Sequence, residues 1–311
     1  MTTTQRGLGA RRRLVSATAV AAGLLAAALM VGHGLVPNMH GLGSALDTVA
    51  PLLVLAVPLL LVLAGATRSR TAALVALVPL VLWAAIWGRS MLPGPDRGAP
   101  QLRVASQNLR ADNPDPAATA RAAAAAGADL LALEEVTADA RDAVEAALAE
   151  TYPYHVLVST VGLWSRYPIG DHAGVDTALG WTRALRAVVD TPSGPVTVYA
   201  AHLGSARPGY TATRDRSVRA LADAVAADPA ERLVVTGDLN TATGDRVMRP
   251  LTDLVHDAQA DAGWGPGATW PAELPLIRPD HVLYRGLTPS AADVLRTPGT
   301  DHRAVTAGFR F

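Results

Sequence analysis

The sequence predicts a mixed α/β domain that follows three transmembrane helices, and three observations carry this prediction. Hydrophobic residues make up 50% of the 311 residues, which is too apolar for one ordinary soluble domain. The apolar excess lies in residues 1–90, whereas residues 102–311 alternate short apolar strands with helical stretches. Residues 91–101 are rich in Pro and Gly, so we expect a linker between a membrane domain and a second domain.

Three apolar runs in the first part are candidates for membrane spans. They are Leu14–Val36, Val49–Ala66 and Thr71–Gly88. Crossing the hydrocarbon core takes about 20 apolar residues, with a range of about 17 to 25. The first run fits this length easily, and the other two lie near its minimum. We therefore expect residues 1–90 to form a membrane domain of three helices.

Arginines predict the orientation of these spans. Six of them flank the ends that we assign to the cytoplasm: Arg6, Arg11, Arg12, Arg13, Arg68 and Arg70. The connection Pro37–Asp47 contains no Arg. The positive-inside rule then places the N-terminus in the cytoplasm and everything after Gly88 outside the cell, with Arg89 and Arg97 as the opposing charges.

Two other arrangements remain open. A cleaved signal peptide could precede two buried helices, although the second and third runs have no polar face that a soluble fold could expose. Alternatively, two spans would leave the second domain inside the cell. Three spans explain the distribution of arginines best.

Composition narrows the chemistry of the second domain. The chain has no cysteine, which excludes disulfides, thiolate nucleophiles and zinc–thiolate sites. From residue 100 onward there are 19 Arg against 25 Asp plus Glu, so this part is net acidic. Domains that bind nucleic acid usually carry a basic footprint. Nucleic acid is therefore not the expected partner.

Polar residues follow the first two strands that we expect in this domain. Leu102–Asn108 alternates as a strand does and ends at Asn108, and the buried strand Asp129–Leu133 is followed by Glu134 and Glu135. A carboxylate costs much free energy when it is buried, unless it is paired or binds a cation. The acidic pair therefore favours a metal site, with a helix cap as the alternative role for either Glu.

Two later strands also end in polar residues. The expected hairpin of Ala184–Asp190 and Val196–Ala201 leads to His202, although a lone His at a strand end is more often structural. Leu233–Thr236 leads into Gly237-Asp238-Leu239-Asn240. In a strand, side chains two residues apart lie on the same side. We therefore expect Asp238 and Asn240 to pair an acid or base with an amide that can hold a phosphate oxygen or a water.

The last polar group lies near the C-terminus. Asp280 stands near the start of the expected strand Arg278–Tyr284, and Asp301 precedes His302 shortly before the terminal strand. A carboxylate beside a His suits metal binding combined with proton transfer. Asp280 could fix the tautomer of that imidazole and raise its basicity.

Taken in order, these motifs resemble the endonuclease/exonuclease/phosphatase superfamily, which includes DNase I, exonuclease III and neutral sphingomyelinases. The resemblance covers residues 102–311. It rests on Asn108, Leu133-Glu134-Glu135, Ser165–Ile169, His202-Leu203, Gly237–Asn240, Asp280–Tyr284 and Thr300–His302. It implies a four-layer α/β sandwich, in which two mixed sheets pack face to face, helices lie outside, and the active site lies at one edge between the sheets.

The resemblance also implies roles for individual residues. Glu135, Asn108 and Asp301 match the metal site, and the family usually has Gln where this chain has Glu134. The matching catalytic positions are Asp238 (activates or positions the water, or protonates the leaving group), Asn240 (orients phosphate or water), His302 (contacts the scissile phosphate, as base or as transition-state stabiliser), Asp280 (orients His302) and His202 (donates to a phosphate oxygen). Oxygen and amide ligands suit a hard cation, so Mg²⁺ is the expected cofactor and Mn²⁺ the second choice.

The expected substrate is a lipid or another small phosphorylated molecule. The arrangement resembles actinobacterial membrane proteins linked to teicoplanin resistance, in which this domain follows three spans. That resemblance implies hydrolysis of a lipid pyrophosphate such as undecaprenyl pyrophosphate at the outer membrane surface. The alternatives are an extracellular endonuclease or a general phosphodiesterase or phosphatase. A binding module with a degenerate site is disfavoured, because every motif position keeps a competent residue.

Four arginines near the motifs have no assigned role. They are Arg183, Arg186, Arg207 and Arg214. Each could bind a second phosphate group, and solvation at the surface is an equal alternative for each of them.

Overall fold

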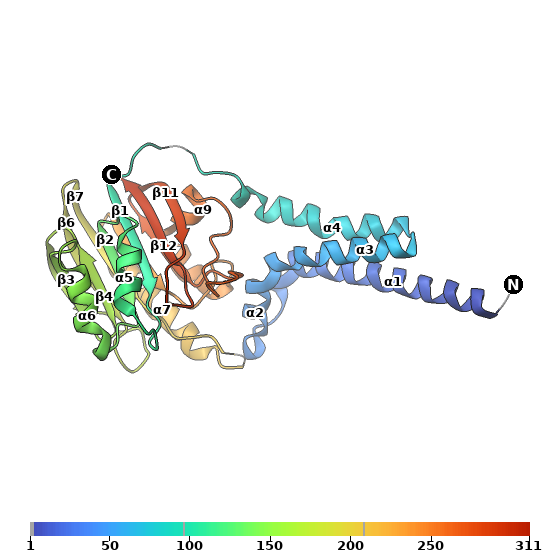
Figure 1. The fold of residues 1–311 in the computed structure, drawn as a ribbon, viewed down its shortest axis with the longest axis horizontal. Helices are drawn as coiled ribbons and strands as arrows, with labels where there is room; N and C mark the ends of the chain where they lie inside the picture. Colours follow the sequence, from blue (N-terminus) through green and yellow to red (C-terminus); the bar gives the residue numbers. More distant parts are fainter. Residues whose placement is uncertain (1–2, 96, 208) are drawn as a thin grey trace. The chain divides into compact units, whose positions relative to one another are not determined.

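A computed structural model describes residues 3–95, 97–207 and 209–311 (Figure 1). Met1, Thr2, Asp96 and Pro208 lie outside the described residues, as do the side chains of residues 3–8, which include Arg6. The chain divides into two compact units, Met1–Met91 and Leu92–Phe311.

The first unit is entirely helical. Its elements are α1 (Thr3–Gly32), η1 (His33–Leu35), η2 (Met39–Gly41), α2 (Leu42–Val49), η3 (Ala50–Ala56), α3 (Val57–Thr67), α4 (Arg70–Trp87) and η4 (Gly88–Met91). Among the described residues, three helical stretches are long and apolar enough to cross a membrane: Gly9–Leu35, Met39–Thr67 and Arg70–Met91. This confirms the three candidate spans. Each is longer than the apolar run that predicted it, because the helices continue into flanking polar residues.

Small residues let the helices of this unit approach closely. Ala19 of α1, Ala64 of α3 and Ala76 of α4 are buried in one apolar cluster. Close packing of small side chains is the usual basis of helix association in a bilayer, where the solvent is as apolar as leucine. Between α3 and α4 the chain turns at Arg68, which has a positive φ of 53°, and Ser69 then caps α4 by accepting a hydrogen bond from Ala72 N–H. The arginine-bearing turn is therefore tight.

The second unit contains two mixed sheets of six strands each among the described residues, in the orders β11-β12-β1-β2-β4-β3 and β5-β6-β7-β8-β10-β9. The strands are β1 (Leu102–Asn108), β2 (Leu130–Glu134), β3 (Tyr154–Val158), β4 (Val161–Ser165), β5 (Ile169–Gly174), β6 (Ala184–Thr191), β7 (Gly194–Ala201), β8 (Leu233–Asp238), β9 (His256–Asp257), β10 (Asp280–Arg285), β11 (Thr288–Leu295) and β12 (Ala304–Arg310). β1 pairs in parallel with β2, and β7 with β8, and the other pairs are antiparallel.

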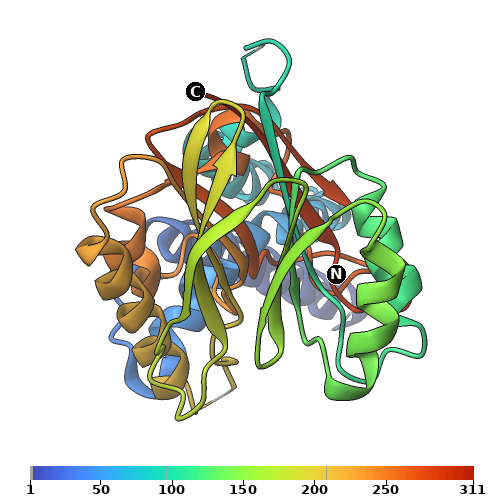
Figure 2. The ribbon, with the colours of Figure 1, turned by 90° about the vertical axis from the view of Figure 1, so that its left-hand side faces the viewer.

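Helices cover the outer face of each sheet. They are α5 (Pro116–Ala124) and α6 (Ala138–Leu148) on one sheet, and α7 (Ala212–Ala227), η5 (Arg246–Met248) and α8 (Arg249–Thr252) on the other. The short helix α9 (Ala258–Ala262) instead contributes Ala258 to the core between the sheets. Figure 2 shows α5 and α6, in green, outside one sheet and α7, in gold, outside the other. The unit is thus a four-layer α/β sandwich, which confirms the predicted fold class.

The alternation of side chains along the strands explains the four layers. In β2, Leu130 and Ala132 belong to the core between the sheets, whereas Leu131 and Leu133 pack under α5 and α6. In β8, Val234 lies in the core between the sheets. Both faces of these strands are covered, so they appear in the sequence as continuous apolar runs.

The segment between the helices and β1 is bound to the second unit. A Cβ built at Gly94 would lie 2.7 Å from backbone atoms of Ala262. Arg97 donates to the Pro289 carbonyl at 2.7 Å, and Gln101 N–H donates to the Phe309 carbonyl at 2.8 Å. Gly94, Arg97 and Gln101, which belong to the stretch predicted as a linker, therefore contact the domain that follows it.

The structure differs from the sequence-based expectation at several strand ends. β8 ends at Asp238, so Asn240 lies beyond the strand, where it has a positive φ of 50°. The premise that both side chains alternate within one strand was therefore wrong. Four further elements were not predicted from the sequence: β3, β5, β11 and α7. Their hydrophobic patterns are weaker, because one face of each element is exposed or polar.

Candidate active site

The polar residues predicted from strand ends meet at one edge of the core between the sheets. Asn108 at the end of β1 pairs with Glu134 at the end of β2, and Asp280 of β10 pairs directly with Asp238 of β8. The apolar stripe that each strand contributes to the core thus ends in a polar side chain. Because these ends are adjacent, residues far apart in the sequence form one site.

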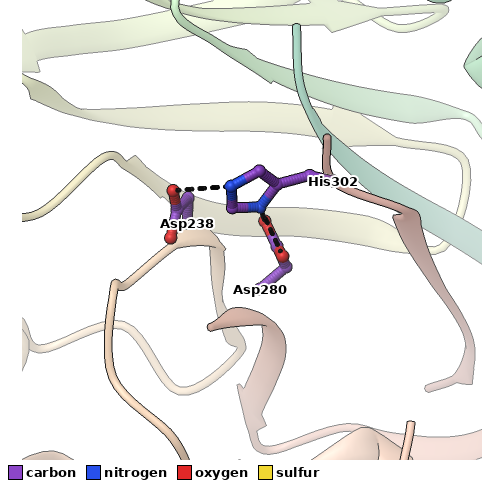
Figure 3. A group of neighbouring side chains, drawn as sticks. All are labelled: Asp238, Asp280 and His302. Carbon is purple, nitrogen blue, oxygen red and sulfur yellow. Dashed lines mark hydrogen bonds and ion pairs between the residues drawn. The ribbon is translucent and has the colours of Figure 1, made fainter. Parts of the chain in front are cut away.

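His302 lies between two carboxylates at this edge (Figure 3). Its Nδ1 is 2.9 Å from Asp280 Oδ2, and its Nε2 is 3.9 Å from Asp238 Oδ2. Thr269 Oγ1 donates a hydrogen bond to the same Asp280 carboxylate. Asp280 therefore holds the imidazole by Nδ1 and leaves Nε2 directed towards Asp238.

The surroundings of His302 favour its charged form. Burial by itself would lower the pKa of His302, but the charge and hydrogen bond of Asp280, together with the charges of Asp238 and Asp301, raise it to about 10. An imidazolium cannot accept a proton. Of the two roles predicted for His302, the geometry therefore favours stabilisation of negative charge over general base catalysis.

Asp238 is the centre of the hydrogen-bond network. Its Oδ2 accepts from Asn108 Nδ2 at 3.0 Å and lies 3.6 Å from His202 Nε2. Its Oδ1 accepts from the Asn240 backbone N–H at 2.9 Å, and the Asn240 side-chain amide donates to the Leu203 carbonyl at 3.0 Å. Burial and the charge of Asp280 raise the pKa of Asp238. A carboxylate with a raised pKa is a better proton acceptor than an exposed one.

His202 differs from His302 although both are buried. Burial lowers the pKa of His202 to about 4, with the charges of Arg183 and His302 acting in the same direction against that of Asp238. His202 is thus a neutral hydrogen-bonding group at physiological pH. One imidazole of the site carries a charge and the other does not.

Close backbone approach shapes the loop that carries Asp238. A Cβ built at Gly237, where φ is +135°, would lie 2.0 Å from the Ala201 carbonyl oxygen. Only Gly fits there. Glu135 and Asn240 also have positive φ, 60° and 50°, at the ends of β2 and β8. Left-handed non-Gly residues are uncommon and cluster at functional sites.

The two adjacent glutamates have opposite surroundings. Glu134 is fully buried, and Ser106 Oγ lies 3.0 Å from its carboxylate; burial and the charge of Asp280 raise its pKa well above the usual value. Glu135 is partly exposed, and its Oε1 accepts from Asn108 Nδ2 at 3.2 Å. Its Oε2 accepts from Ala111 N–H. Glu135 is the carboxylate that a cation from solvent could reach.

Asp301 lies at the rim of the site. Its exposed carboxylate accepts a hydrogen bond from Trp270 Nε1 at 3.2 Å, and its charge acts on His302 and on Arg110. The side chains of Asp301 and His302 therefore point in different directions, although the two residues are adjacent in the sequence. The metal role predicted for Asp301 stays a prediction, while its electrostatic effect on His302 follows from the geometry.

The donor set suits a hard divalent cation at Glu135 and Asn108. Asn108 Nδ2 donates to Glu135 and to Asp238, and Asn108 Oδ1, the atom that a cation would bind, accepts from Arg110 N–H at 2.8 Å, so two carboxylates and an amide lie close together. Oxygen-rich groups without thiolates are the ligands that Mg²⁺ prefers. Asp238, Asp280 and His302 also have atoms within 4.8 Å of one another, as a metal cluster would. However, Nδ1 of His302 already forms a hydrogen bond with Asp280. This favours proton transfer over metal binding as the role of Asp238, Asp280 and His302.

Some residues of the site had no role assigned from the sequence. Thr269 lies in a loop without periodicity, yet it fixes Asp280. Thr300 Oγ1 donates to the Asn108 carbonyl at 2.8 Å and accepts from the His302 N–H, so it ties the last motif to β1. Arg183 contacts His202 and was only one of several unassigned arginines. The roles of such Thr and Arg residues become apparent only in the folded structure, which brings them next to their partners.

The chain belongs to the endonuclease/exonuclease/phosphatase family, because the sequence model of that family matches residues 105–302, more than half of the chain. The matched range begins in β1 and ends at His302. No curated protein sequence matches the chain. At the level of its family, the protein is a metal-dependent hydrolase that acts on phosphoesters.

Solved structures share the fold. A humanized D. rerio TDP2 is 17% identical, with a TM-score of 0.58 over 68% of this chain and 99% of that chain. D. rerio TDP2 complexed with a single-strand DNA product is 18% identical, with a TM-score of 0.58 and coverage of 68% and 99%. A Staphylococcus aureus beta toxin mutant with bound magnesium ions is 14% identical, with a TM-score of 0.52 and coverage of 67% and 99%. At these identities the likeness shows the fold alone.

Proposed function

We propose that this protein is a membrane-anchored, metal-dependent hydrolase of a lipid phosphate or pyrophosphate, acting at the outer membrane surface. One observation carries the proposal: the buried group Asp238–His302–Asp280 lies beside Glu135 and Asn108 in a chain that also has three candidate spans. A phosphoester site joined to membrane helices suits a substrate in the same bilayer.

Mg²⁺ is the proposed cofactor, with Mn²⁺ as the second choice, and Glu135 and Asn108 would hold it. When bound, the cation would supply charge neutralisation at the phosphoryl oxygens. The magnesium-bound beta toxin of the same fold supports this choice. Asp301, at the rim, would complete the site or support it electrostatically.

The remaining residues would divide the proton and charge chemistry. Asp238 would take a proton from the attacking water, since its raised pKa suits a base. His302, kept charged by Asp280, would stabilise the negative charge that develops on the phosphoryl group. His202 would donate to a phosphate oxygen, and Asn240 would orient the phosphate or the water.

A lipid pyrophosphate such as undecaprenyl pyrophosphate is the proposed substrate. The residues from 100 onward have 19 Arg against 25 Asp plus Glu, so the domain lacks the basic surface that DNA binding favours. The arginines of the first part flank the candidate spans instead, in the pattern that predicts a domain outside the cell. A link to glycopeptide resistance would follow from such a reaction.

Incubation of the full-length protein in detergent with undecaprenyl pyrophosphate and Mg²⁺ tests the proposal. We expect phosphate release that stops on addition of a chelator. No release from the lipid, alongside turnover of a soluble phosphoester, would reject the lipid substrate while keeping the hydrolase.

An extracellular nuclease or general phosphodiesterase is the second candidate. The observation in its favour is that TDP2, which shares the fold, is complexed with a DNA product. A gel assay on plasmid DNA with Mg²⁺ separates the two candidates. Nicking at protein concentrations that leave the lipid intact would favour the nuclease.

A further inference from the structure

Arg183 lies at the candidate active site and has no part in the reaction described above. It directly precedes β6, and its backbone carbonyl accepts a hydrogen bond from the His202 N–H at 2.8 Å. The antiparallel pairing of β6 with β7 thus places the two side chains next to each other. A role for Arg183 there rests on the proposed function, since it concerns the same substrate.

The guanidinium of Arg183 contacts the imidazole of His202. One terminal nitrogen lies 2.6 Å from Nε2 and also contacts Nδ1. A neutral imidazole has one N–H and one lone pair, so the guanidinium can donate only to the unprotonated nitrogen. Nε2 lies 3.6 Å from Asp238 Oδ2 and 3.7 Å from Glu135 Oε1, which favours a proton there. Arg183 then donates to Nδ1 and holds His202 as an Nε2–H donor, a tautomer that we assign from these contacts.

The charge of Arg183 has no anion in direct contact. Within the part of the chain that the structure describes, no carboxylate forms an ion pair with it, and its Nε is buried without a hydrogen-bond partner. Burial lowers its pKa, while the charges of Glu135 and Asp238 act to keep it charged, so the guanidinium is within electrostatic reach of the site. A partly buried cation loses hydration, and a bound anion would compensate for that loss.

A second contact restrains the guanidinium without using its donors. Its central carbon lies 5.0 Å from the ring of Trp181, which is 50% exposed. This cation–π contact fixes the plane of the group. Arg186, which lies in β6, is different, because its Nε donates to Asp228 at 2.6 Å and its terminal nitrogen to Asp171. Arg186 is neutralised within the fold, and Arg183 is not.

We propose that Arg183 binds a non-bridging oxygen of the substrate phosphate, beside the Nε2–H donor of His202. Its planar fork of donors matches the geometry of a phosphate group. The ligand class is therefore a phosphate with free oxygens, and Arg183 is a residue that determines affinity for it.

Binding of inorganic phosphate to the full-length protein, in detergent and with saturating Mg²⁺, tests this assignment without turnover. The rise in melting temperature during a phosphate titration gives the affinity, since a ligand that binds only the folded state stabilises it. We expect Arg183→Met to weaken phosphate binding by roughly tenfold or more, as loss of a charge-assisted hydrogen bond does. Arg183→Lys should lose less, because it keeps the charge but not the fork.

Arg186→Met is the matched control. It should lower the melting temperature without phosphate, because Asp228 loses its partner, and leave the phosphate affinity unchanged. Wild-type affinity in Arg183→Met, an equal loss in Arg186→Met, or no phosphate-dependent shift in the wild-type protein would each overturn the assignment. The proposed function fails by a different result, the absence of hydrolysis, so the two failures are distinguishable.

Discussion

The two halves of the candidate site differ in their access to solvent. Glu135, on the proposed metal side, has 27% of its side chain exposed, whereas Asp238 and Asp280 have 2% and 1%. Glu135, in the exposed half, directly follows β2 and has a left-handed backbone conformation. The buried half lies on β8 and β10, which are paired directly. The same family site is thus open where a cation would enter and closed where protons would move.

The difference shows that one fold can place carboxylates of the same site in two kinds of surroundings, one near solvent and one buried. Near solvent, a carboxylate is accessible to cations and can exchange them. Between the sheets, burial raises the pKa of Asp238 while Asp280 raises the pKa of His302. Groups with pKa values pushed apart by their surroundings are the usual basis for separate acid and base roles.

The largest expected effect is at the buried half. Asp238→Asn keeps the shape of the side chain and removes the charge next to His302, so we expect kcat/KM to fall by about 10³-fold. The measurement is phosphate release from whichever substrate the protein turns over. Asp223→Asn, at an exposed position on α7, is the control and should be silent. Activity of Asp238→Asn within threefold of wild type would show that the buried half is not the proton-transfer side.

An intermediate effect is expected at the exposed half. Glu135→Gln should raise the Mg²⁺ concentration for half-maximal activity by about 10- to 100-fold, because a charged ligand becomes a neutral one. Glu134→Gln should change it little, since an amide can still accept from Ser106 and Gln is the family's usual residue. A Mg²⁺ titration of both variants decides between the adjacent glutamates. The opposite ranking would assign the cation to the buried residue.

The last expected effect is of a different kind, because it concerns the stability of the fold next to the buried half and not activity. Burial, together with the charge of Arg278, lowers the pKa of His281 from 6.5 to about 4, and its Nε2 lies 2.8 Å from the Thr241 carbonyl. Between pH 6.5 and about pH 4, the unfolded chain therefore binds more protons than the folded protein does. The stabilisation is present above pH 6.5 and is lost as the pH falls to about 4, by about 3 kcal/mol in total.

His281→Gln keeps a donor for Thr241 and removes the titration. Urea unfolding of both proteins at pH 7 and pH 4.5 should therefore show a shallower pH dependence in the variant. His202 leaves a residual slope, because burial also lowers its pKa to about 4. Equal slopes in the two proteins would mean that His281 is accessible to protons in the folded state.

Much of this site could be predicted because many of its residues lie at the ends of buried strands. Asn108, Glu134, Asp238 and Asp280 each end or begin an apolar stripe, and parallel or paired strands bring such ends together. The fold class followed from the ordered motifs for the same reason. Local pattern and tertiary position agree wherever a residue belongs to a buried strand.

The remaining residues depend on contacts that no pattern encodes. Thr269 reaches Asp280 from an irregular loop, and Arg183 reaches His202 through the pairing of β6 with β7. Asn240 approaches Asp238 through a left-handed backbone, not through strand alternation. Asp301 and His302 are adjacent in sequence, but their side chains diverge. Sequence spacing predicts proximity of backbones, and side-chain direction follows only from the packed structure.

The contacts of Gly94, Arg97 and Gln101 with the domain have a consequence for how the protein would reach its substrate under the proposed function. Helix η4 ends at Met91, and Gly94 already packs on the domain. The free leash between anchor and domain is then only a few residues, each spanning at most about 3.6 Å. Under the proposed function, a connection of this length would tether the domain to the bilayer that holds its substrate, which gives the substrate a high effective concentration.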